Sequence, residues 1–230
     1  MSTAAASAAA ATEPVVAPLF VDIVSDVVCP WCYIGKRKLE AALATLRREP
    51  GLVITVRWHP FELNPDLPAQ GMPRAAYIEA KFGGKTPADA IYERVRTVGA
   101  EAGIVFAFDR IRLQPNTLDA HRLIAWAQQR GDAEVLVERL FRAFFTEGRN
   151  LGAIDELVAL AADTGLPADE TRAMLVSAAY RAEVKAECRE AQESGITGVP
   201  FFIFNGRAAV SGAHDPATLL EAIAAARASA

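Results

Sequence analysis

Residues 25–35 read Ser25-Asp26-Val27-Val28-Cys29-Pro30-Trp31-Cys32-Tyr33-Ile34-Gly35. A mostly apolar run over residues 19–24 precedes this stretch and predicts a buried strand, and a helical pattern follows it as far as Pro50-Gly51. Cys29 and Cys32 therefore lie where a strand passes into a helix. The first turn of a helix carries N–H groups without intrahelical partners and the positive end of the helix dipole, which favour a thiolate. We predict that Cys29 is more acidic than an ordinary cysteine and reactive.

The spacing of the two cysteines assigns them different chemical roles. In a CxxC at a helix start, we expect the first sulfur to face solvent and the second to lie a turn deeper, so that Cys29 attacks an incoming disulfide and Cys32 resolves the mixed disulfide. Pro30 suits the first helical position because its missing N–H would have no partner there, and Trp31 adds apolar surface without charge. Asp26 has two candidate roles, proton transfer to Cys32 and capping of the helix.

The composition is that of an ordinary globular chain. It has 230 residues, of which 52% are hydrophobic and 23% charged, enough for one sizeable core or one domain with a large insertion. The net charge of −4 gives no general attraction to nucleic acid or to anionic membranes, and no run of eighteen apolar residues occurs, so we expect neither partner.

Cysteine usage and the first residues bear on location. Three cysteines do not make a secreted disulfide framework. The first seventeen residues are mostly Ala, Ser and Thr and lack both the charged start and the apolar core of a secretory signal. We therefore expect a disordered tail over residues 1–18 and a cytoplasmic location.

The middle of the chain is predicted to be helical. Alternating apolar residues over 52–58 predict a second strand, which would form a right-handed parallel βαβ unit with the first. Prolines and glycines over 60–72 predict a loop that leaves the sheet. Six helices are then expected, at 73–82, 87–102, 117–130 after an Asn116 cap, 133–146, 153–163 and 167–177, as a bundle whose core includes Trp126, Phe141, Phe144 and Phe145.

The end of the chain returns to the sheet. A helix at 178–193, a strand to Phe204, the hairpin signal Asn205-Gly206, a strand at 207–211 and a helix at 216–226 follow in order. Strand, helix, strand, then helix, strand, strand, helix is the order of the thioredoxin fold. The predicted fold class is α/β, with a thioredoxin-like domain of residues 19–64 and 178–230 split by an all-helical insertion domain of residues 65–177. Because that fold has a cis-proline loop facing its CxxC, we expect Val199–Pro200 to be cis.

Four groups of residues together resemble the FrnE-like branch of the DsbA family. They are residues 26–37, residues 60–65, Asn116-Thr117 with residues 120–123, and residues 198–202. The resemblance extends over about residues 19–225. It implies dithiol-disulfide exchange with Cys29 as nucleophile, Cys32 as its partner and Pro200 as the cis-proline, and with Val199 offering backbone hydrogen bonds to an extended substrate segment. It also implies that Glu62, Asn116 and Thr117 line the cleft between the domains, with helix capping and loop hydrogen bonding as the alternative.

Two residues have open roles. His214 stands where relatives generally have Gln, and it is either a surface histidine that caps the last helix or a pH sensor. Cys188 is most simply a small buried apolar residue, since a second redox role lacks a partner cysteine in the sequence.

Three readings of the function compete. The leading one is a cytosolic thiol-disulfide oxidoreductase that forms, reduces or isomerises disulfides in proteins or small thiol compounds, without a metal or organic cofactor but with glutathione as a candidate redox partner. The second is a glutathione-dependent isomerase or transferase of small aromatic substrates, since kappa-class glutathione transferases and hydroxychromene carboxylate isomerases resemble the same scaffold. Those enzymes usually have Ser where this chain has Cys29, and Cys32 would tend to expel bound glutathione as a disulfide.

The third reading is a redox-inert binding module that keeps the CxxC as a relic or a metal clip. A zinc site would need Cys29, Cys32 and Cys188 with one of His59, His121 and His214, but no second CxxC or HxxxH accompanies them. The sequence indicates neither the direction of exchange nor the oligomeric state.

Overall fold

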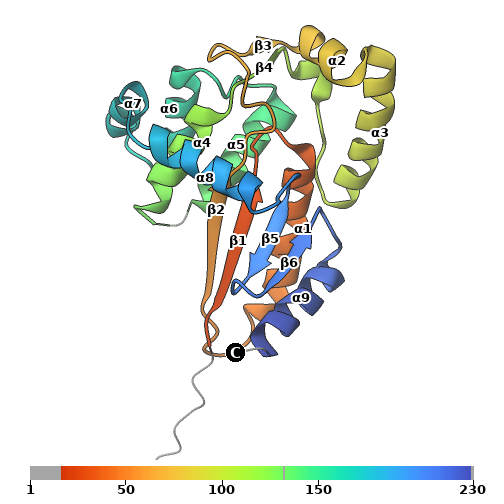
Figure 1. Cartoon of the computed structure of the whole chain (residues 1–230), viewed down its shortest axis with the longest axis vertical. Coiled ribbons are helices and arrows are strands. Elements are labelled where there is room, and N and C mark those ends of the chain that lie inside the picture. The colour runs from red at the N-terminus through yellow and green to blue at the C-terminus, as the bar shows by residue number, and fades with distance from the viewer. Residues whose placement is uncertain (1–16, 132, 229–230) are drawn as a thin grey trace, which may run out of the picture.

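A four-stranded sheet organises the computed structural model, which describes residues 17–131 and 133–228 (Figure 1). The expected tail, residues 1–18, lies outside the described residues except for its last two. The strand order is β2-β1-β5-β6, with β1 parallel to β2 and antiparallel to β5, and β5 antiparallel to β6. The strands are β1 (Leu19–Ser25), β2 (Ile54–Pro60), β5 (Phe201–Phe204) and β6 (Ala208–Ser211). The predicted βαβ unit and C-terminal hairpin are therefore confirmed.

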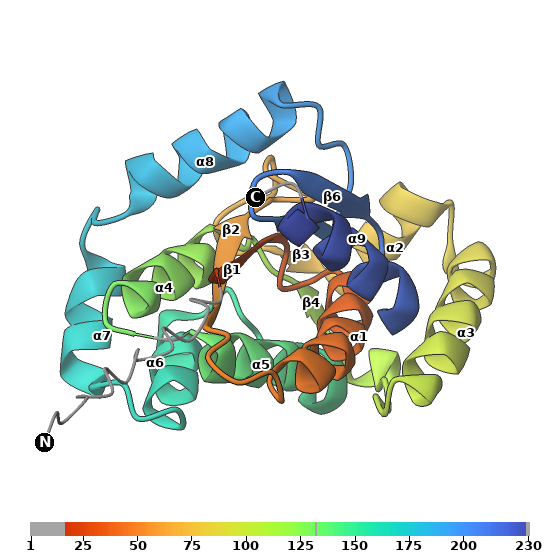
Figure 2. The same ribbon diagram turned by 90° about the horizontal axis from the view of Figure 1, so that it is seen from below.

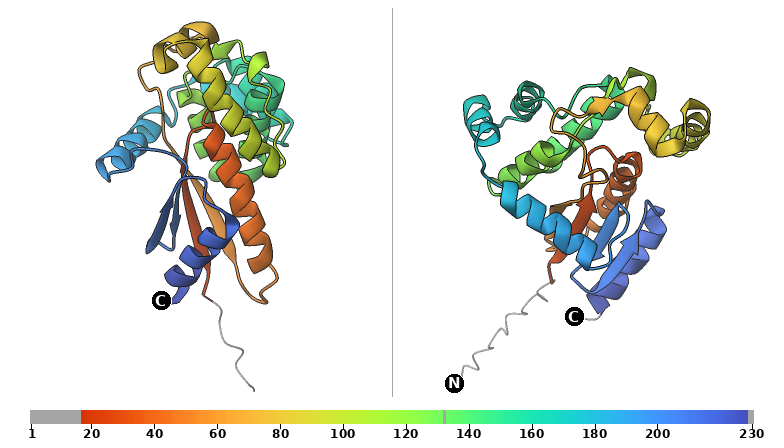
Figure 3. Two further views of the ribbon diagram at one scale, coloured as in Figure 1. Left: turned by 90° about the vertical axis from the view of Figure 1, so that its right-hand side faces the viewer. Right: turned by 45° about the horizontal axis from the view of Figure 1, so that its top comes forward.

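Helices cover both faces of this sheet, which gives the predicted thioredoxin arrangement. Figure 3 (left) shows α1 (Pro30–Leu46) and α9 (Pro216–Ala228) on one face and α8 (Arg181–Glu193) on the other. α1 buries an apolar stripe that includes Ile34, Leu39 and Leu43, as its helical spacing predicts. Burial of this stripe against the central strand β1 fixes the position of the helix that begins beside Cys29.

β2 lies two residues later than the alternation predicts, and the prediction that Pro60 begins the loop is wrong. Pro60 is the last residue of β2 and pairs with Ser25, and the N–H of the next residue, Phe61, donates to the Ser25 carbonyl at 3.0 Å. β2 is an edge strand, and successive residues of a strand point their N–H groups to opposite sides. The nitrogen of Pro60 therefore faces away from β1, where its missing N–H costs no ladder bond.

The predicted Asn205-Gly206 turn joins β5 to β6 with both residues at positive φ, 51° and 66°. The N–H of Arg207 donates to the Phe204 carbonyl at 3.0 Å and closes the turn. This is the turn geometry whose twist matches that of a hairpin. The side chain of Asn205 also accepts a hydrogen bond from the N–H of Phe20 at 2.8 Å, which ties the turn to β1.

The inserted helices form two groups and not the single bundle that we expected (Figures 1 and 2). α2 and α3 lie together beside α1, and α4 to α7 lie together beyond β2. Their bounds are α2 (Arg74–Phe82), α3 (Lys85–Glu101), α4 (Leu118–Gln128), α5 (Glu134–Arg142), α6 (Ile154–Ala162) and α7 (Ala168–Val176). The six predicted helices are thus present, within a few residues at each end. The described residues hold no helix with the length and apolar character that crossing a membrane requires.

Several short elements were not predicted. A π-helical turn, Ala143–Glu147, follows α5 where the pattern predicted continuous helix, and a 3₁₀ turn spans Phe108–Arg110. β3 (Met72–Pro73) pairs with β4 (Leu113–Gln114) in a second small sheet. Two-residue strands are too short to show an alternating pattern, so no sequence pattern indicates them.

Aromatic rings connect the two helical groups to α1. The ring of Tyr33 in α1 stacks on Phe141 of α5 at a centroid distance of 5.1 Å and meets Phe106 edge-on at 6.2 Å. The four aromatic residues predicted to be core are all 4% exposed or less: Trp126, Phe141, Phe144 and Phe145. Such close ring contacts add to the free energy gained by burial.

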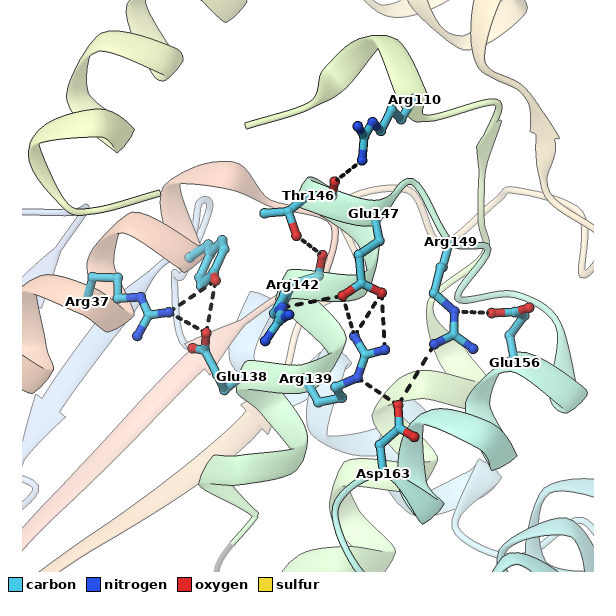
Figure 4. Close-up of polar contacts among 11 residues, drawn as sticks. Arg37, Arg110, Glu138, Arg139, Arg142, Thr146, Glu147, Arg149, Glu156 and Asp163 are labelled. Carbon is cyan, nitrogen blue, oxygen red and sulfur yellow. Dashed lines mark hydrogen bonds and ion pairs between the residues drawn. The ribbon is translucent and has the colours of Figure 1, made fainter. Parts of the chain in front are cut away.

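Charged side chains also hold α5 in place (Figure 4). Arg139 donates to Asp163 at the end of α6 at 2.9 Å and to Glu147 at 3.0 and 3.1 Å. On the other side of α5, Glu138 accepts a hydrogen bond from Arg37 of α1. The helix that follows the CxxC is therefore tied to the inserted helices by both rings and charges.

Candidate active site

Cys29 stands at the N-terminal boundary of α1, as the sequence predicts. It occupies the N-cap position with extended backbone (φ −92°, ψ 113°), and Pro30 is the first helical residue. The carbonyl of Cys29 accepts hydrogen bonds from the N–H groups of Cys32 at 3.1 Å and Tyr33 at 3.3 Å. This geometry puts the first cysteine at the positive end of the helix dipole.

Both cysteines are buried, so the expectation that Cys29 faces solvent is wrong for this structure. Cys29 is 5% exposed and Cys32 1%. The thiol of Cys29 donates to the carbonyl of Val199 at 3.5 Å, which places the residue under the loop before β5. Burial raises the pKa of Cys32 well above its ordinary value, and neighbouring Cys29 raises it further, while the Ser25 side chain and the Asp26 backbone oppose the rise. Cys32 is therefore a thiol at neutral pH.

The Val199–Pro200 peptide bond is cis, as predicted, and its loop lies against α1. A Cβ atom on Gly35 of α1 would lie 2.9 Å from Cγ of Pro200 and 3.0 Å from the ring of Phe202. Glycine at this position thus permits the close approach of the helix to the proline loop. Trp31, between the two cysteines, is half-buried against the core.

Asp26 is completely buried and holds two backbone segments together. Its Oδ2 accepts a hydrogen bond from the N–H of Leu63 at 2.8 Å, and its Oδ1 accepts a long one from the N–H of Val28 at 3.4 Å. Within the described chain, no side chain caps the start of α1, so the capping role proposed for Asp26 is not what the structure shows. Asp26 instead fixes the loop after β2 to the turn that precedes Cys29.

Glu62, Asn116 and Thr117 lie on the segments that meet this turn. Burial raises the pKa of Glu62; the charge of His121 opposes this rise and that of Asp26 adds to it. The amide of Asn116 donates to the carbonyl of Leu67 at 2.8 Å and accepts from the N–H of Leu118 at 3.0 Å.

Thr117, 4% exposed, is the N-cap residue of α4. Asn116 thus ties the loop after β2 to the start of α4. That Glu62, Asn116 and Thr117 line a substrate cleft stays an expectation.

Ser25 and His121 are buried polar residues for which the sequence indicates no catalytic role. His121 is a candidate zinc ligand and lies in one of the groups that resemble the FrnE-like branch. Ser25, the last residue of β1, is 4% exposed and lies beside Cys32. His121 of α4 is also 4% exposed, and its Nε2 lies 3.4 Å from Oδ1 of Asp26. The available signal was a polar residue within an otherwise apolar segment, which more often marks an ordinary buried residue than a site.

The two residues with open roles, Cys188 and His214, have different environments. Cys188 is 5% exposed and packs with Leu118 and Val184, as expected of a small apolar residue. Burial, followed by the charge of Glu62, raises the pKa of its thiol to about 12. His214 is exposed. Across residues 17–131 and 133–228, no group of three or more histidine, cysteine or acidic side chains is arranged to hold a metal ion, so the zinc set is not assembled.

Comparison with known proteins identifies the scaffold. The family model of the DSBA-like thioredoxin domain matches residues 20–224. The structure of a probable DsbA oxidoreductase from Streptomyces coelicolor is similar with a TM-score of 0.81 and 35% identity, over 92% of this chain and 91% of that one.

Three solved structures with less sequence identity share the fold alone. The cytosolic disulfide reductase DsbM from Pseudomonas aeruginosa matches with a TM-score of 0.59 and 20% identity, over 91% of this chain and 95% of its own. A structure of DsbM with GSH matches with a TM-score of 0.52. A 2-hydroxychromene-2-carboxylate isomerase matches with a TM-score of 0.60 and 18% identity, over 90% of this chain and 94% of its own.

Proposed function

The chain belongs to the family of DSBA-like thioredoxin domains, and from this premise we propose that it is a thiol-disulfide oxidoreductase acting through Cys29 and Cys32. One observation carries the proposal: a CxxC pair begins α1, and its first thiol is 3.5 Å from the carbonyl that precedes the cis-proline. Within the family we assign the chain to the FrnE-like branch, on the residues quoted for that resemblance.

The exchange reaction divides between the two cysteines. The thiolate of Cys29 attacks one sulfur of a substrate disulfide, whose other sulfur leaves as a thiolate. Cys32 then loses its proton and attacks Cys29, so that a Cys29–Cys32 disulfide forms and the reduced substrate departs. The same steps in reverse oxidise a dithiol substrate. The direction depends on the reduction potential of the pair, and about 30 mV changes the equilibrium tenfold for this two-electron couple.

Partners and location are part of the proposal. We propose protein or small thiol compounds as substrates and glutathione as a redox partner, with support from the structure of DsbM with GSH. A cytoplasmic location is supported by the three cysteines, which form no secreted framework, and by the cytosolic DsbM. The isomerase shares the fold at 18% identity, and no specific feature of the Cys29–Cys32 site favours its activity here.

The test is the reaction of reduced protein with oxidised glutathione, quenched in acid and followed by intact mass. The wild type should lose two hydrogens as the Cys29–Cys32 disulfide forms. Cys32→Ser should keep glutathione bound to Cys29, and Cys29→Ser should react far more slowly. Cys188→Ser is the matched control and should behave like the wild type. A Cys29→Ser variant as reactive as the wild type would contradict the proposal, and a persistent glutathione adduct on the wild type would favour the isomerase or transferase function.

A further inference from the structure

A small cavity lies beside Ser25, with about 30 Å³ of space for the centre of a water molecule. Its polar lining comes from β1, β2, α4 and α8 and consists of Ser25, His59, His121, Gln128 and Glu187. A cavity of this size and polarity suits one water molecule, which needs two to four polar partners.

Two polar atoms of this lining have no bonding partner. The Oγ of Ser25 and the Nε2 of His121 are both buried, and neither has a hydrogen-bond partner of acceptable geometry among the described residues. Buried polar groups are nearly always paired, and an unpaired one calls for an explanation such as an ordered water or a catalytic role. Because both residues line one cavity, a single water molecule with slight adjustment of the two side chains would serve both atoms.

Acidic side chains from several elements lie near His121. Asp26, from the turn after β1, has Oδ1 3.4 Å from Nε2 of His121. Glu62, from the loop after β2, interacts with His121 electrostatically. The cavity wall also carries His59 of β2 and Glu187 of α8. Two carboxylates near an imidazole stabilise the imidazolium that forms when it takes up a proton.

His59 lines the same cavity, but both of its ring nitrogens lie near carboxylate oxygens. Its Nε2 lies 2.9 Å from Oδ1 of Asp22, and its Nδ1 lies 3.5 Å from Oε2 of Glu187. Both oxygens of Asp26 are likewise occupied, because they accept hydrogen bonds from Leu63 and Val28. Of these three side chains, His121 is the one with a buried polar atom that lacks a hydrogen-bond partner among the described residues.

Cys32 needs such an acceptor. It is 1% exposed, so its proton cannot pass directly to bulk water, and the Ser25 side chain lies next to its sulfur. Ser25 therefore stands between Cys32 and the cavity that His121 also lines.

We propose that His121 accepts the proton of Cys32 through the Ser25 hydroxyl and a water molecule in this cavity, during the exchange reaction proposed above, on which this inference rests. As the proton moves to Nε2 of His121, the sulfur of Cys32 attacks Cys29. The Cys29–Cys32 bond forms, the bond between Cys29 and the substrate sulfur breaks, and the substrate leaves as a thiolate that takes a proton from solvent. In the reverse direction, His121 returns its proton to Cys32 as that sulfur leaves. His121 acts through Ser25, so it is a positioning residue for proton transfer.

The test is a stopped-flow reaction with 5,5′-dithiobis(2-nitrobenzoate), a coloured disulfide reagent that separates the two cysteines. Attack by Cys29 releases the first nitrothiobenzoate, and attack by Cys32 on the mixed disulfide releases the second. His121→Gln should leave the first phase unchanged and slow the second roughly 10²-fold near neutral pH, the usual size of general-base catalysis. The deficit should shrink as pH rises, because hydroxide then removes the proton from Cys32.

Two further variants make the test specific. Ser25→Ala, a smaller change in packing, should slow the second phase in the same way, whereas His59→Gln, the other cavity histidine, should match the wild type. The inference is overturned if His121→Gln and Ser25→Ala keep the wild-type second phase, if both phases slow together, or if the deficit is the same at every pH. A wild type that never releases the second nitrothiobenzoate would refute the oxidoreductase function itself, and the inference with it.

Discussion

His121 and Arg122 are neighbours on α4, and both are buried, at 4% and 0% exposure. Their side chains nevertheless differ in how completely their nitrogens are hydrogen-bonded. Every nitrogen of the Arg122 guanidinium has an acceptor: Nε donates to the carbonyl of Ala179, Nη1 to Leu175 and Asp119, and Nη2 to Met174 and Ser177. The Nε2 of His121 has no hydrogen-bond partner within the part of the chain that the structure describes. A saturated buried charge supports the fold, whereas an unsaturated group beside a cavity remains available for proton transfer.

The largest effect should come from Arg122→Leu. Its guanidinium donates to three carbonyls at the end of α7, and its loss would leave those of Leu175 and Ser177 without a donor. Met174 would keep the hydroxyl of Ser177. We expect a loss of about 3–5 kcal/mol in the free energy of unfolding, measured with denaturant. Arg172→Leu, which breaks an exposed ion pair with Asp155, is the control and should lose less than about 1 kcal/mol. Equal losses in the two variants would remove the distinction between Arg122 and a surface arginine.

Glu138→Gln tests a cluster of charged side chains between α1 and α5, in which one oxygen of Glu138 accepts hydrogen bonds and the other lies beside a buried ammonium. Glu138 accepts hydrogen bonds from Tyr33 at 2.9 Å and from Arg37, and its other oxygen lies 3.1 Å from Nζ of Lys36, which is 2% exposed. The variant should lose about 1.5–3 kcal/mol, the range for hydrogen bonds to charged groups. In a Lys36→Met background the same change should cost less, because the buried ammonium is gone. An identical loss in both backgrounds would show that Lys36 and Glu138 are not coupled.

Glu62→Gln tests the surroundings of His121 through the pH dependence of the free energy of unfolding. Burial raises the pKa of Glu62, so the folded state binds its proton more tightly than the unfolded state does. This tighter proton binding by Glu62 stabilises the folded state fully below the pKa of the unfolded chain, about 4.3. The stabilisation is lost as pH rises through the pKa of Glu62 in the folded state. Glu62→Gln should therefore be more stable than the wild type at pH 7, and this gain should be smaller than the loss in Arg122→Leu. The difference in stability between Glu62→Gln and the wild type should disappear towards pH 4. Denaturant unfolding at both pH values measures it, and a variant less stable than the wild type at pH 7 would contradict this sign.

The smallest effect on stability should come from His121→Leu. The Nε2 of His121 makes no hydrogen bond that an apolar side chain would lose, and its contact with Asp26 is long, at 3.4 Å. We expect the free energy of unfolding to change by less than about 1 kcal/mol, even though disulfide exchange slows. A loss as large as that of Arg122→Leu would show that His121 is a structural residue, and the contrast between the two neighbours would fail.

The fold could be predicted because its signals are local. The strand before Cys29, the hairpin at Asn205-Gly206 and the order of the elements each follow from residues close together in the sequence. Pro60 was assigned to the loop because sequence does not reveal that β2 is an edge strand, where a proline can end the ladder. The two groups of inserted helices were missed for a similar reason, since helical spacing reveals the apolar face of each helix but not the surface that this face meets.

The site could be predicted only in part. The positions of Cys29, Cys32 and Pro200 follow from motifs, but the burial of Cys29 depends on the carbonyl of Val199, a residue 170 positions away. Ser25 and His121 are also far apart in sequence, and their unpaired atoms become visible only when both line the same cavity. Whether a buried polar group is satisfied is a property of the tertiary structure, which is why His121 and Arg122 are hard to distinguish in the sequence.

Equilibration across glutathione redox buffers tests whether Cys29 and Cys32 form a dithiol-disulfide couple. At each step the free thiols are trapped by alkylation and mapped by mass spectrometry. We expect the thiols of Cys29 and Cys32 to be lost together and reversibly at one potential, while Cys188 stays reduced. Cys29→Ser should abolish this transition. If Cys29 and Cys32 never pair, or if only a persistent glutathione adduct forms, the two cysteines are not a dithiol-disulfide couple.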